Sequence, residues 1–84
     1  MFKLEIYVKL KSNVLDPQGK AIEQAAKSIN IKNITEVKQG KYFEILVDKE
    51  LSKEKIVLIG NQLSKKLLCN EVIEDYKIIK IKKI

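Results

Sequence analysis

Residues 2–11 read Phe2-Lys3-Leu4-Glu5-Ile6-Tyr7-Val8-Lys9-Leu10-Lys11, and this stretch decides the fold. Apolar and polar side chains alternate along it without a break, a period of two that is typical of a β-strand with one buried side. The even-numbered residues therefore predict the inner face of a sheet. The odd-numbered residues, Tyr7 among them, predict an open face.

Two amphipathic helices follow this strand. Asp16 and Pro17 are typical of an N-cap and a first helical residue, and apolar side chains then recur at helical spacing up to Ile29, before a predicted end at Asn30. A second helix is expected after Ser52, which can cap it. Its predicted inner stripe consists of Ile56, Ile59, Leu63 and Leu67.

Three further strands complete the expected order. Residues 34–38 predict a weak strand, Gln39-Gly40 a turn in which glycine supplies a positive φ, and residues 41–47 an alternating strand. Residues 72–84 predict the last strand, where the adjacent Ile78 and Ile79 indicate a bulge or a cover on both faces, the second cover coming from another subunit. The order βαββαβ predicts a ferredoxin-like α+β fold, with four antiparallel strands and two helices on one face.

The composition limits the size and class of the protein. The chain has 84 residues, 45% of them apolar and 33% charged, so we expect one domain over residues 1–84, with a thin core and a tendency to oligomerise. No apolar run reaches the roughly 18 residues that a membrane helix needs, which predicts a soluble, cytoplasmic protein without membrane contact. The formal net charge of +6 is interpreted mainly as a solvated surface.

The residue types that most catalytic and metal sites need are scarce. The sequence has no His and no Arg, so the usual general base, the commonest metal ligand and the bidentate phosphate binder are missing. The single cysteine, Cys69, is interpreted as a small buried hydrophobe, and the charges of Glu74-Asp75-Tyr76 as solvated or interface charges. We therefore expect no catalytic, cofactor-binding or metal-binding residue, and a non-catalytic oligomeric module.

Two glycine-containing motifs leave alternatives open. Gly19 lies where a helix begins, so it indicates either simple capping or the close approach of another backbone. Gly40-Lys41-Tyr42-Phe43 is superficially similar to an RNA-recognition motif, but Tyr42 and Phe43 point to opposite faces, so only one could stack on a base. An RNA-binding domain using the Tyr7/Tyr42 face stays open. So does a ligand-sensing domain of ACT type, which has the same element order.

Three segments together resemble one family. Residues 14–20 (Val-Leu-Asp-Pro-Gln-Gly-Lys), 40–45 (Gly-Lys-Tyr-Phe-Glu-Ile) and 70–78 (Asn-Glu-Val-Ile-Glu-Asp-Tyr-Lys-Ile) look like the PurS subunit of phosphoribosylformylglycinamidine synthase, over essentially the whole chain. The resemblance implies a subunit without its own active site, acting in the fourth step of de novo purine synthesis. There a glutaminase subunit (PurQ) releases ammonia and a synthetase subunit (PurL) activates the amide with ATP.

The resemblance also implies partners and contact residues. We expect the chain to form a homodimer or homotetramer, to dock PurL and PurQ and to support ammonia transfer, without binding nucleic acid. The contacts are expected in three short segments. The predicted protein-interface residues are Leu15, Asp16, Pro17, Gln18, Gly19, Gly40, Lys41, Tyr42, Glu74, Asp75 and Tyr76.

Overall fold

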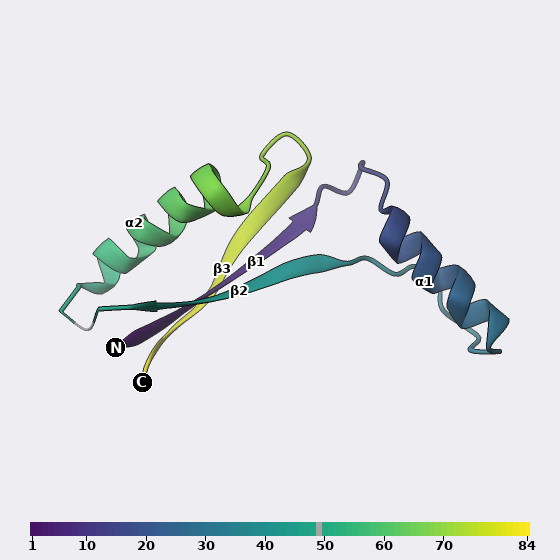
Figure 1. The fold of residues 1–84 in the computed structure, drawn as a ribbon, viewed down its shortest axis with the longest axis horizontal. Coiled ribbons are helices and arrows are strands. Elements are labelled where there is room, and N and C mark those ends of the chain that lie inside the picture. Colours follow the sequence, from purple (N-terminus) through teal and green to yellow (C-terminus); the bar gives the residue numbers. More distant parts are fainter. Residues whose placement is uncertain (49) are drawn as a thin grey trace.

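The chain forms one antiparallel sheet and two main helices (Figure 1). The computed structural model describes residues 1–48 and 50–84. In chain order its elements are β1 (Phe2–Leu10), α1 (Pro17–Ser28), β2 (Gly40–Val47), α2 (Lys53–Leu63), the short π-helix η1 (Ser64–Leu68) and β3 (Glu74–Lys83). The strand order β2-β1-β3, antiparallel at both junctions, confirms the α+β class and is consistent with a ferredoxin-like sheet that lacks its second strand.

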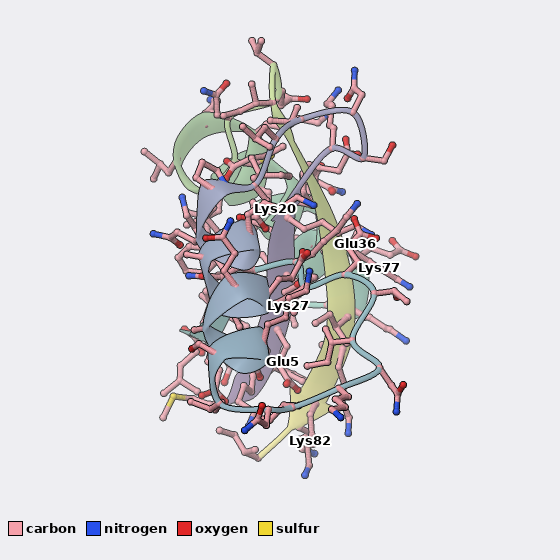
Figure 2. The ribbon with its side chains drawn as sticks, turned by 90° about the vertical axis from the view of Figure 1, so that its right-hand side faces the viewer. Glu5, Lys20, Lys27, Glu36, Lys77 and Lys82 are labelled. Atoms are coloured by element: carbon pink, nitrogen blue, oxygen red, sulfur yellow. The ribbon has the colours of Figure 1, made fainter. Side chains whose placement is uncertain are left out.

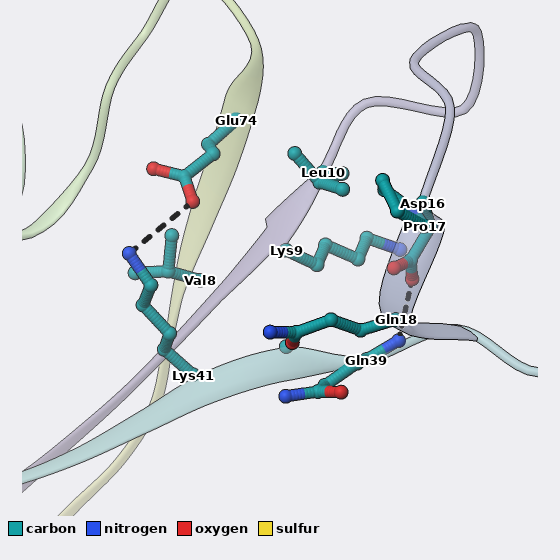
Figure 3. Close-up of a pocket in the computed structure, with 10 residues that line it drawn as sticks. Val8, Lys9, Leu10, Asp16, Pro17, Gln18, Gln39, Lys41 and Glu74 are labelled. Atoms are coloured by element: carbon teal, nitrogen blue, oxygen red, sulfur yellow. Dashed lines mark hydrogen bonds and ion pairs between the residues drawn. The ribbon is translucent and has the colours of Figure 1, made fainter. Parts of the chain in front are cut away.

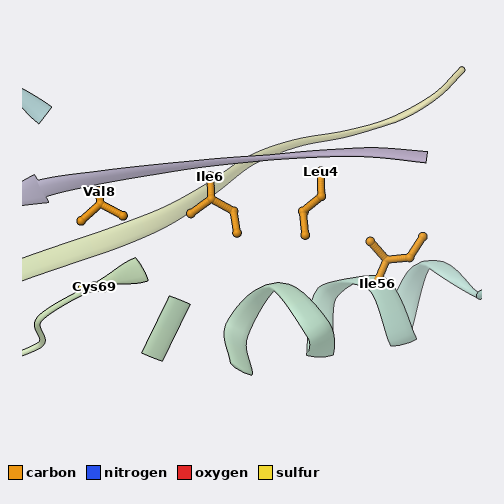
Figure 4. Close-up of a cluster of buried hydrophobic side chains, with 5 residues drawn as sticks. All are labelled: Leu4, Ile6, Val8, Ile56 and Cys69. Carbon is orange, nitrogen blue, oxygen red and sulfur yellow. The ribbon is translucent and has the colours of Figure 1, made fainter. Parts of the chain in front are cut away.

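The core lies between the centre of the sheet and α2. Leu4, Ile6 and Val8 point from β1 to the side on which α2 lies, where Ile56 faces Leu4, and all four side chains are fully buried (Figure 4). Cys69, just after η1, closes the same cluster. The alternation in residues 2–11 therefore assigned the inner face of β1 correctly.

Helix α2 lies very close to the sheet because a glycine faces it. A Cβ atom at Gly60 would lie 3.1 Å from side-chain atoms of both Leu4 and Ile78, which is tighter than ordinary packing. The helix begins as predicted at Ser52, whose hydroxyl accepts a hydrogen bond from the Lys55 backbone N–H at 3.3 Å.

The end of the second helix departs from the predicted apolar stripe. Ile59 and Leu63 are half-buried, but Leu67 is 76% exposed, so its placement on the inner face was wrong. From Ser64 onward the backbone adopts π-helical geometry, which turns each residue by a smaller angle than an α-helix does. Ser64, where this turn begins, continues the buried row of Ile56 and Gly60 at four-residue spacing, whereas Leu67, within the turn, is exposed.

A bulge interrupts the last strand, which confirms one of the two interpretations of its adjacent isoleucines. Ile6 on β1 is opposite Ile78, whereas the preceding Glu5 is opposite Lys80, so Ile79 is an extra residue on β3. Ile78 packs against the core and Ile79 is half exposed.

Helix α1 begins and ends where the sequence indicates. Asp16 is its N-cap and Pro17 its first residue. At the other end Asn30 has a φ of 64°, and the backbone N–H of Ile31 donates to the carbonyl of Ala26 at 3.0 Å. These are the features of a Schellman motif, in which a left-handed residue closes the helix.

The prediction that both helices cover one face of the sheet was wrong for α1. Figure 1 shows α1 beyond the end of the sheet, away from the face that α2 covers. The extended residues 31–39 run back beside α1. They are held there because the Val37 N–H donates to a Glu23 carboxylate oxygen and the Gln39 N–H to Asp16. The helix therefore packs on this segment rather than on the strands.

The predicted strand at residues 34–38 and the turn at Gln39-Gly40 were also wrong. Residues 31–39 carry no strand assignment, and Gly40 opens β2 without a positive φ. Since the chain does not reverse at Gly40, residues 34–38 are directed away from the sheet and have no neighbouring strand to pair with.

The protein is elongated for its length. Its radius of gyration is 16.4 Å and its extents are 51 × 29 × 15 Å, whereas a compact chain of this size has a radius near 12 Å. Figure 2 looks along the long axis from the α1 end, with Lys20 and Lys27 on α1 and Glu36 on the segment beside it. Such a shape leaves much of the apolar surface of α1 uncovered.

Candidate functional site

The three segments singled out in the sequence approach one another at one end of the sheet, around a pocket of about 380 Å³ (Figure 3). It lies where β1 ends and where α1, β2 and β3 begin. Six of the predicted interface residues line it: Asp16, Pro17, Gln18, Gly40, Lys41 and Glu74. Its remaining lining residues are Val8, Lys9, Leu10 and Gln39.

Asp16 connects the start of α1 to the start of β2. Its Oδ1 atom accepts from the Gly19 backbone N–H at 2.9 Å, and its Oδ2 atom from the Gln39 backbone N–H at 2.8 Å. These two hydrogen bonds, the one from Gln39 most of all, hold the pKa of Asp16 below its usual value. Asp16 therefore fixes the geometry of the pocket while it caps the helix.

Both glycines of the predicted site are in close contact with a neighbour, Gly19 with backbone and Gly40 with a side chain. A Cβ atom at Gly19 would collide with the carbonyl oxygen of Val37, which confirms the close backbone approach that the sequence left open. A Cβ atom at Gly40 would collide with the ring and hydroxyl of Tyr7. Gly40 is thus explained by its packing against Tyr7 and not by a turn.

Glu74 connects β3 to β2 on the opposite side of the pocket. Its Oε2 atom lies 3.6 Å from Lys41 Nζ, and its Oε1 atom accepts from the Asn70 backbone N–H at 2.8 Å. The Glu74 carbonyl oxygen accepts from the Cys69 thiol, and burial raises the pKa of this thiol. The Glu74 side chain is only 12% exposed, and its contacts join the start of β3 to Lys41 on β2 and to the Asn70 backbone.

Two residues of the predicted set lie on the open face of the sheet. The Tyr42 hydroxyl donates to the Glu5 carboxylate, which raises the pKa of Tyr42 to about 12. Asp75 pairs with Lys11 at 3.8 Å. The pocket does not include either side chain.

The other three predicted residues also lie outside the pocket lining. Tyr76 points to the inner side, where its hydroxyl donates to Asn61 Oδ1 at 2.8 Å and joins β3 to α2. Leu15 is 71% exposed on the loop before α1, and Gly19 is buried beneath the helix start. The eleven predicted residues therefore surround one end of the sheet on several sides.

Sequence reasoning missed Lys9 and Gln39 as lining residues. Lys9 lies directly opposite Gly40 on the neighbouring strand, which is a tertiary relation that periodicity does not contain. Gln39 was assigned to a turn, although its backbone N–H is the partner of Asp16. The β1–β2 register would have been needed to find Lys9, and the path of the chain before β2 to find Gln39.

The part of the chain that the structure describes contains no group of three or more His, Cys, Asp or Glu side chains placed to hold a metal ion. Among its helices, none combines the length and the apolar character needed to cross a membrane.

Comparison with known proteins identifies the family. The family model of PurS, phosphoribosylformylglycinamidine (FGAM) synthase, matches residues 3–82. The PurS subunit of phosphoribosylformylglycinamidine synthase from Bacillus subtilis is 40% identical over 77 residues, which are 92% of this chain and 89% of the relative.

Solved structures agree with this assignment. The crystal structure of Methanocaldococcus jannaschii PurS, one of the subunits of formylglycinamide ribonucleotide amidotransferase in the purine biosynthetic pathway, has a TM-score of 0.88 and 37% identity, covering 100% of this chain and 99% of that one. A chain in the structure of PurLQS from Thermotoga maritima has a TM-score of 0.81 and 30% identity, covering 99% of this chain and 96% of that one. The chain belongs to the PurS family of phosphoribosylformylglycinamidine synthase.

Proposed function

We propose that this chain is the non-catalytic assembly subunit of a phosphoribosylformylglycinamidine synthase complex, and that it docks a PurL synthetase and a PurQ glutaminase so that ammonia passes between them. The observation that carries the proposal is the convergence of residues 15–19, 40–42 and 74–76 at one end of the sheet. The similarity over nearly the whole chain to a component of the T. maritima PurLQS structure supports it.

These three segments form what we call the end surface, and we propose that it contacts the other subunits. Its exposed apolar side chains, Leu15 at 71% and Tyr42 at 51%, are of the kind that protein interfaces bury. Asp16 and Glu74 hold the segments in place from within. A rigid surface of this kind loses little conformational entropy when a partner binds.

We also propose that the chain pairs with a second copy through α1. Ala26 of this helix is buried in the protomer, but Ile22 is 48% exposed and Ile29, the residue that caps the helix, is 67% exposed. On the sheet, α2 packs against β1 and β3. The inner face of β2 is left half-exposed, and its apolar residues are Phe43, Ile45 and Val47.

A second copy of α1 beside α2 would cover that part of β2 and complete a layer of two helices. The same contact repeated by the two-fold axis would bury both copies of α1, which gives a closed homodimer. A homotetramer would then be a pair of such dimers. The elongated protomer, with its small core, supports this arrangement.

The mass of the protein in solution tests this self-association. Light scattering behind a sizing column is expected to give at least twice the 9.7 kDa of one chain. Ile22→Glu should reduce the mass to that of a protomer, because a charge would be buried against β2. Gln24→Glu, on the opposite side of α1, should leave the mass unchanged, and a wild-type protein that stays monomeric at high concentration contradicts the proposal.

We propose further that the partners are proteins and not nucleic acids. Glu5 accepts from the Tyr42 hydroxyl, and Glu44 lies on the same open face, so a phosphate stacked near Tyr42 would meet two carboxylates. Fluorescence anisotropy with single-stranded RNA should show no binding with a steep salt dependence. We also propose that residues 1–84 act as a single domain in the cytoplasm, where a lone cysteine stays reduced.

Reconstitution tests the assembly function. Purified PurL and PurQ from the same source are assayed with and without this chain, first with glutamine and then with ammonium as nitrogen donor. Glutamine-dependent synthesis should require the chain, and ammonium-dependent turnover by PurL should not. If glutamine-dependent turnover is the same without the chain and no complex forms, the assembly function is excluded.

A matched pair of variants locates the contact. Leu15→Glu places a charge on the end surface, and Leu46→Glu makes the same change at an exposed position near the opposite end of the sheet. We expect Leu15→Glu to lower glutamine-dependent activity severalfold and Leu46→Glu to leave it within twofold, because buried unpaired charges weaken interfaces. Equal effects would exclude the end surface as the docking site.

A further inference from the structure

Helix α1 and the extended segment that follows it form one unit, because side chains of the helix bind the backbone of the segment. The Val37 N–H donates to a Glu23 carboxylate oxygen at 3.0 Å, and the Gln39 N–H donates to Asp16 Oδ2 at 2.8 Å. We call this unit, residues 16–39, the helical arm. Its last residue is therefore fixed to its first one.

The residue after the helical arm already belongs to the sheet. Gly40 lies opposite Lys9 at the start of β2 and packs closely against the Tyr7 ring. Because Gln39 and Gly40 are adjacent in the sequence, no residue is free between the arm and the sheet. A reversal of the chain into an antiparallel hairpin takes at least two turn residues. The chain therefore continues directly from the arm into β2 and holds the arm beyond the end of the sheet (Figure 1).

The connection at the other end of the helical arm is longer. Residues 11–15 join β1 to the arm, and Ser12 and Asn13 are exposed in a turn. A connection of this length is sufficient for a helix to return over the strand that it follows, as in a ferredoxin-like fold. It is the junction between Gln39 and Gly40 that opposes such a return.

We propose that the missing turn at this junction determines whether the helical arm packs on its own sheet or on that of a second copy. The inference rests on the self-association proposed above, and it adds that the same apolar surfaces can meet within one chain. Ile22 of the arm is half exposed, as are the apolar residues on the inner face of β2. A connection too short for the closed arrangement favours exchange of the segment between two copies.

A longer junction tests the proposal. Insertion of Ser-Asn-Gly-Ser between Gln39 and Gly40 supplies a turn and leaves the contacts of both residues in place. The arm meets the same surface in either arrangement, so its effective concentration near its own sheet, which is millimolar for a short flexible connection, exceeds that of a second copy at micromolar protein. We therefore expect light scattering to give the mass of one chain for this variant and of at least two chains for the wild type.

The shape of the variant shows whether the arm has closed. X-ray scattering should give a radius of gyration near 12 Å, the value of a compact chain of this size, instead of the 16.4 Å of the extended protomer. The control carries the same four residues between Ser12 and Asn13. It lengthens the connection that is already long enough, so it should keep the mass of the wild type.

Thermal melts followed by circular dichroism verify that both variants are folded. A variant with the longer junction that keeps the wild-type mass, or that is monomeric but extended, overturns the proposal. So does a control that becomes a compact monomer, because the junction between Gln39 and Gly40 is unchanged in it.

The wild type separates this inference from the self-association on which it rests. A wild type that is monomeric with a radius close to 16.4 Å excludes the homodimer. The radius of the variant with the longer junction then still decides the inference, since a compact variant supports closure of the arm and an extended one excludes it. A wild type that is a compact monomer overturns both, because the arm would close despite the short junction.

Discussion

The two helices of this protein have similar lengths but very different surroundings. Helix α2 lies on the sheet, with Ile56 fully buried against Leu4 and with Gly60 in close contact with the strands. Helix α1 lies beyond the end of the sheet, and Ile22 in the helix and Ile29 at its end are exposed. The α2 half is thus completed by its own chain, whereas the α1 half leaves apolar side chains exposed, and it is there that we propose a second chain binds.

The difference follows from how each helix is connected. The chain after α2 continues through η1 and a short connection into β3, which pairs with β1 and so holds α2 over the core. The chain after α1 is extended and runs back beside the helix, because Glu23 and Asp16 bind its backbone. In a protein this small, the arrangement leaves apolar side chains around α1 outside the core, where they are accessible to another chain.

The largest effect is expected in the α2 half. Replacing Ile56 by Ala should lower the free energy of unfolding by about 3 kcal/mol, since it leaves a cavity against β1. The comparison variant is Ile79→Ala, at the exposed bulge, with an expected change below about 0.5 kcal/mol. Urea denaturation monitored by circular dichroism measures both. Similar losses would mean that the core is not concentrated under α2.

The second effect concerns the α1 half and depends on protein concentration. Ile29→Ala should leave the melting temperature nearly unchanged at dilution, because the side chain is 67% exposed in the protomer. At concentrations where copies associate, the same variant should lower the melting temperature by roughly 4–8 °C, as expected for about 1 kcal/mol in a domain of this size. An equal loss at every concentration would show that Ile29 acts within the protomer.

A third test concerns the two hydrogen bonds by which Asp16 joins the start of α1 to the residue before β2. Asp16→Asn keeps an acceptor for the Gly19 N–H, but its amide nitrogen cannot accept from Gln39, so we expect the melting temperature at neutral pH to fall by a few degrees. The pKa of Asp16 is lowered in the folded state. Its contribution to stability is therefore complete above the ordinary value of 3.8 and is lost as the pH falls through the lower folded-state pKa.

Thermal melts of the wild type and of Asp16→Asn across this pH range provide the check. The two melting temperatures should converge as the pH is lowered below 3.8, because protonated Asp16 no longer accepts strongly from either N–H. A gap that stays constant down to acid unfolding would mean that the carboxylate charge is not what holds the segment.

The smallest effect is a gain in stability. The Ser64 hydroxyl is fully buried and has no hydrogen-bond partner within the described residues. Ser64→Ala removes that unsatisfied group and improves helix propensity, so we expect the free energy of unfolding to rise by about 0.5–1 kcal/mol. Ser28→Ala is the control, since its exposed hydroxyl already donates to the Ala25 carbonyl. Destabilisation by Ser64→Ala would indicate a hydrogen bond that the structure does not contain.

Local rules were sufficient for much of the fold. The alternation in residues 2–11 identified β1 and its inner face, and Asp16, Pro17 and Ser52 marked the helix starts correctly. The bulge at Ile79 was one of the two interpretations that the adjacent isoleucines allowed. Each of these features depends on side chains only a few residues apart, which is the range over which a sequence pattern is informative.

The errors arose where the answer depended on residues far apart in sequence. Residues 34–38 have an extended pattern, but a strand also needs a neighbour, and the path set by Asp16 and Glu23 takes this segment away from the sheet. At the end surface, the sequence analysis predicted Asp16 and Glu74 as interface residues, and the structure places both at one pocket. The sequence could not indicate that their carboxylates hold the chain together, or that Lys9 lies across from Gly40.

The bulge at Ile79 has a consequence for how the length of this chain can change. Before the bulge Lys77 lies opposite Tyr7, and after it Lys80 lies opposite Glu5, so both lysines face outward although their spacing is odd. Deleting Ile79 alone would join the two halves of β3 into one regular strand with every side chain on its present face. Removing a residue of β3 other than Ile78 or Ile79 would instead reverse the faces of the residues beyond it. The strand therefore contains one position at which a gap in an alignment of related sequences can be accommodated.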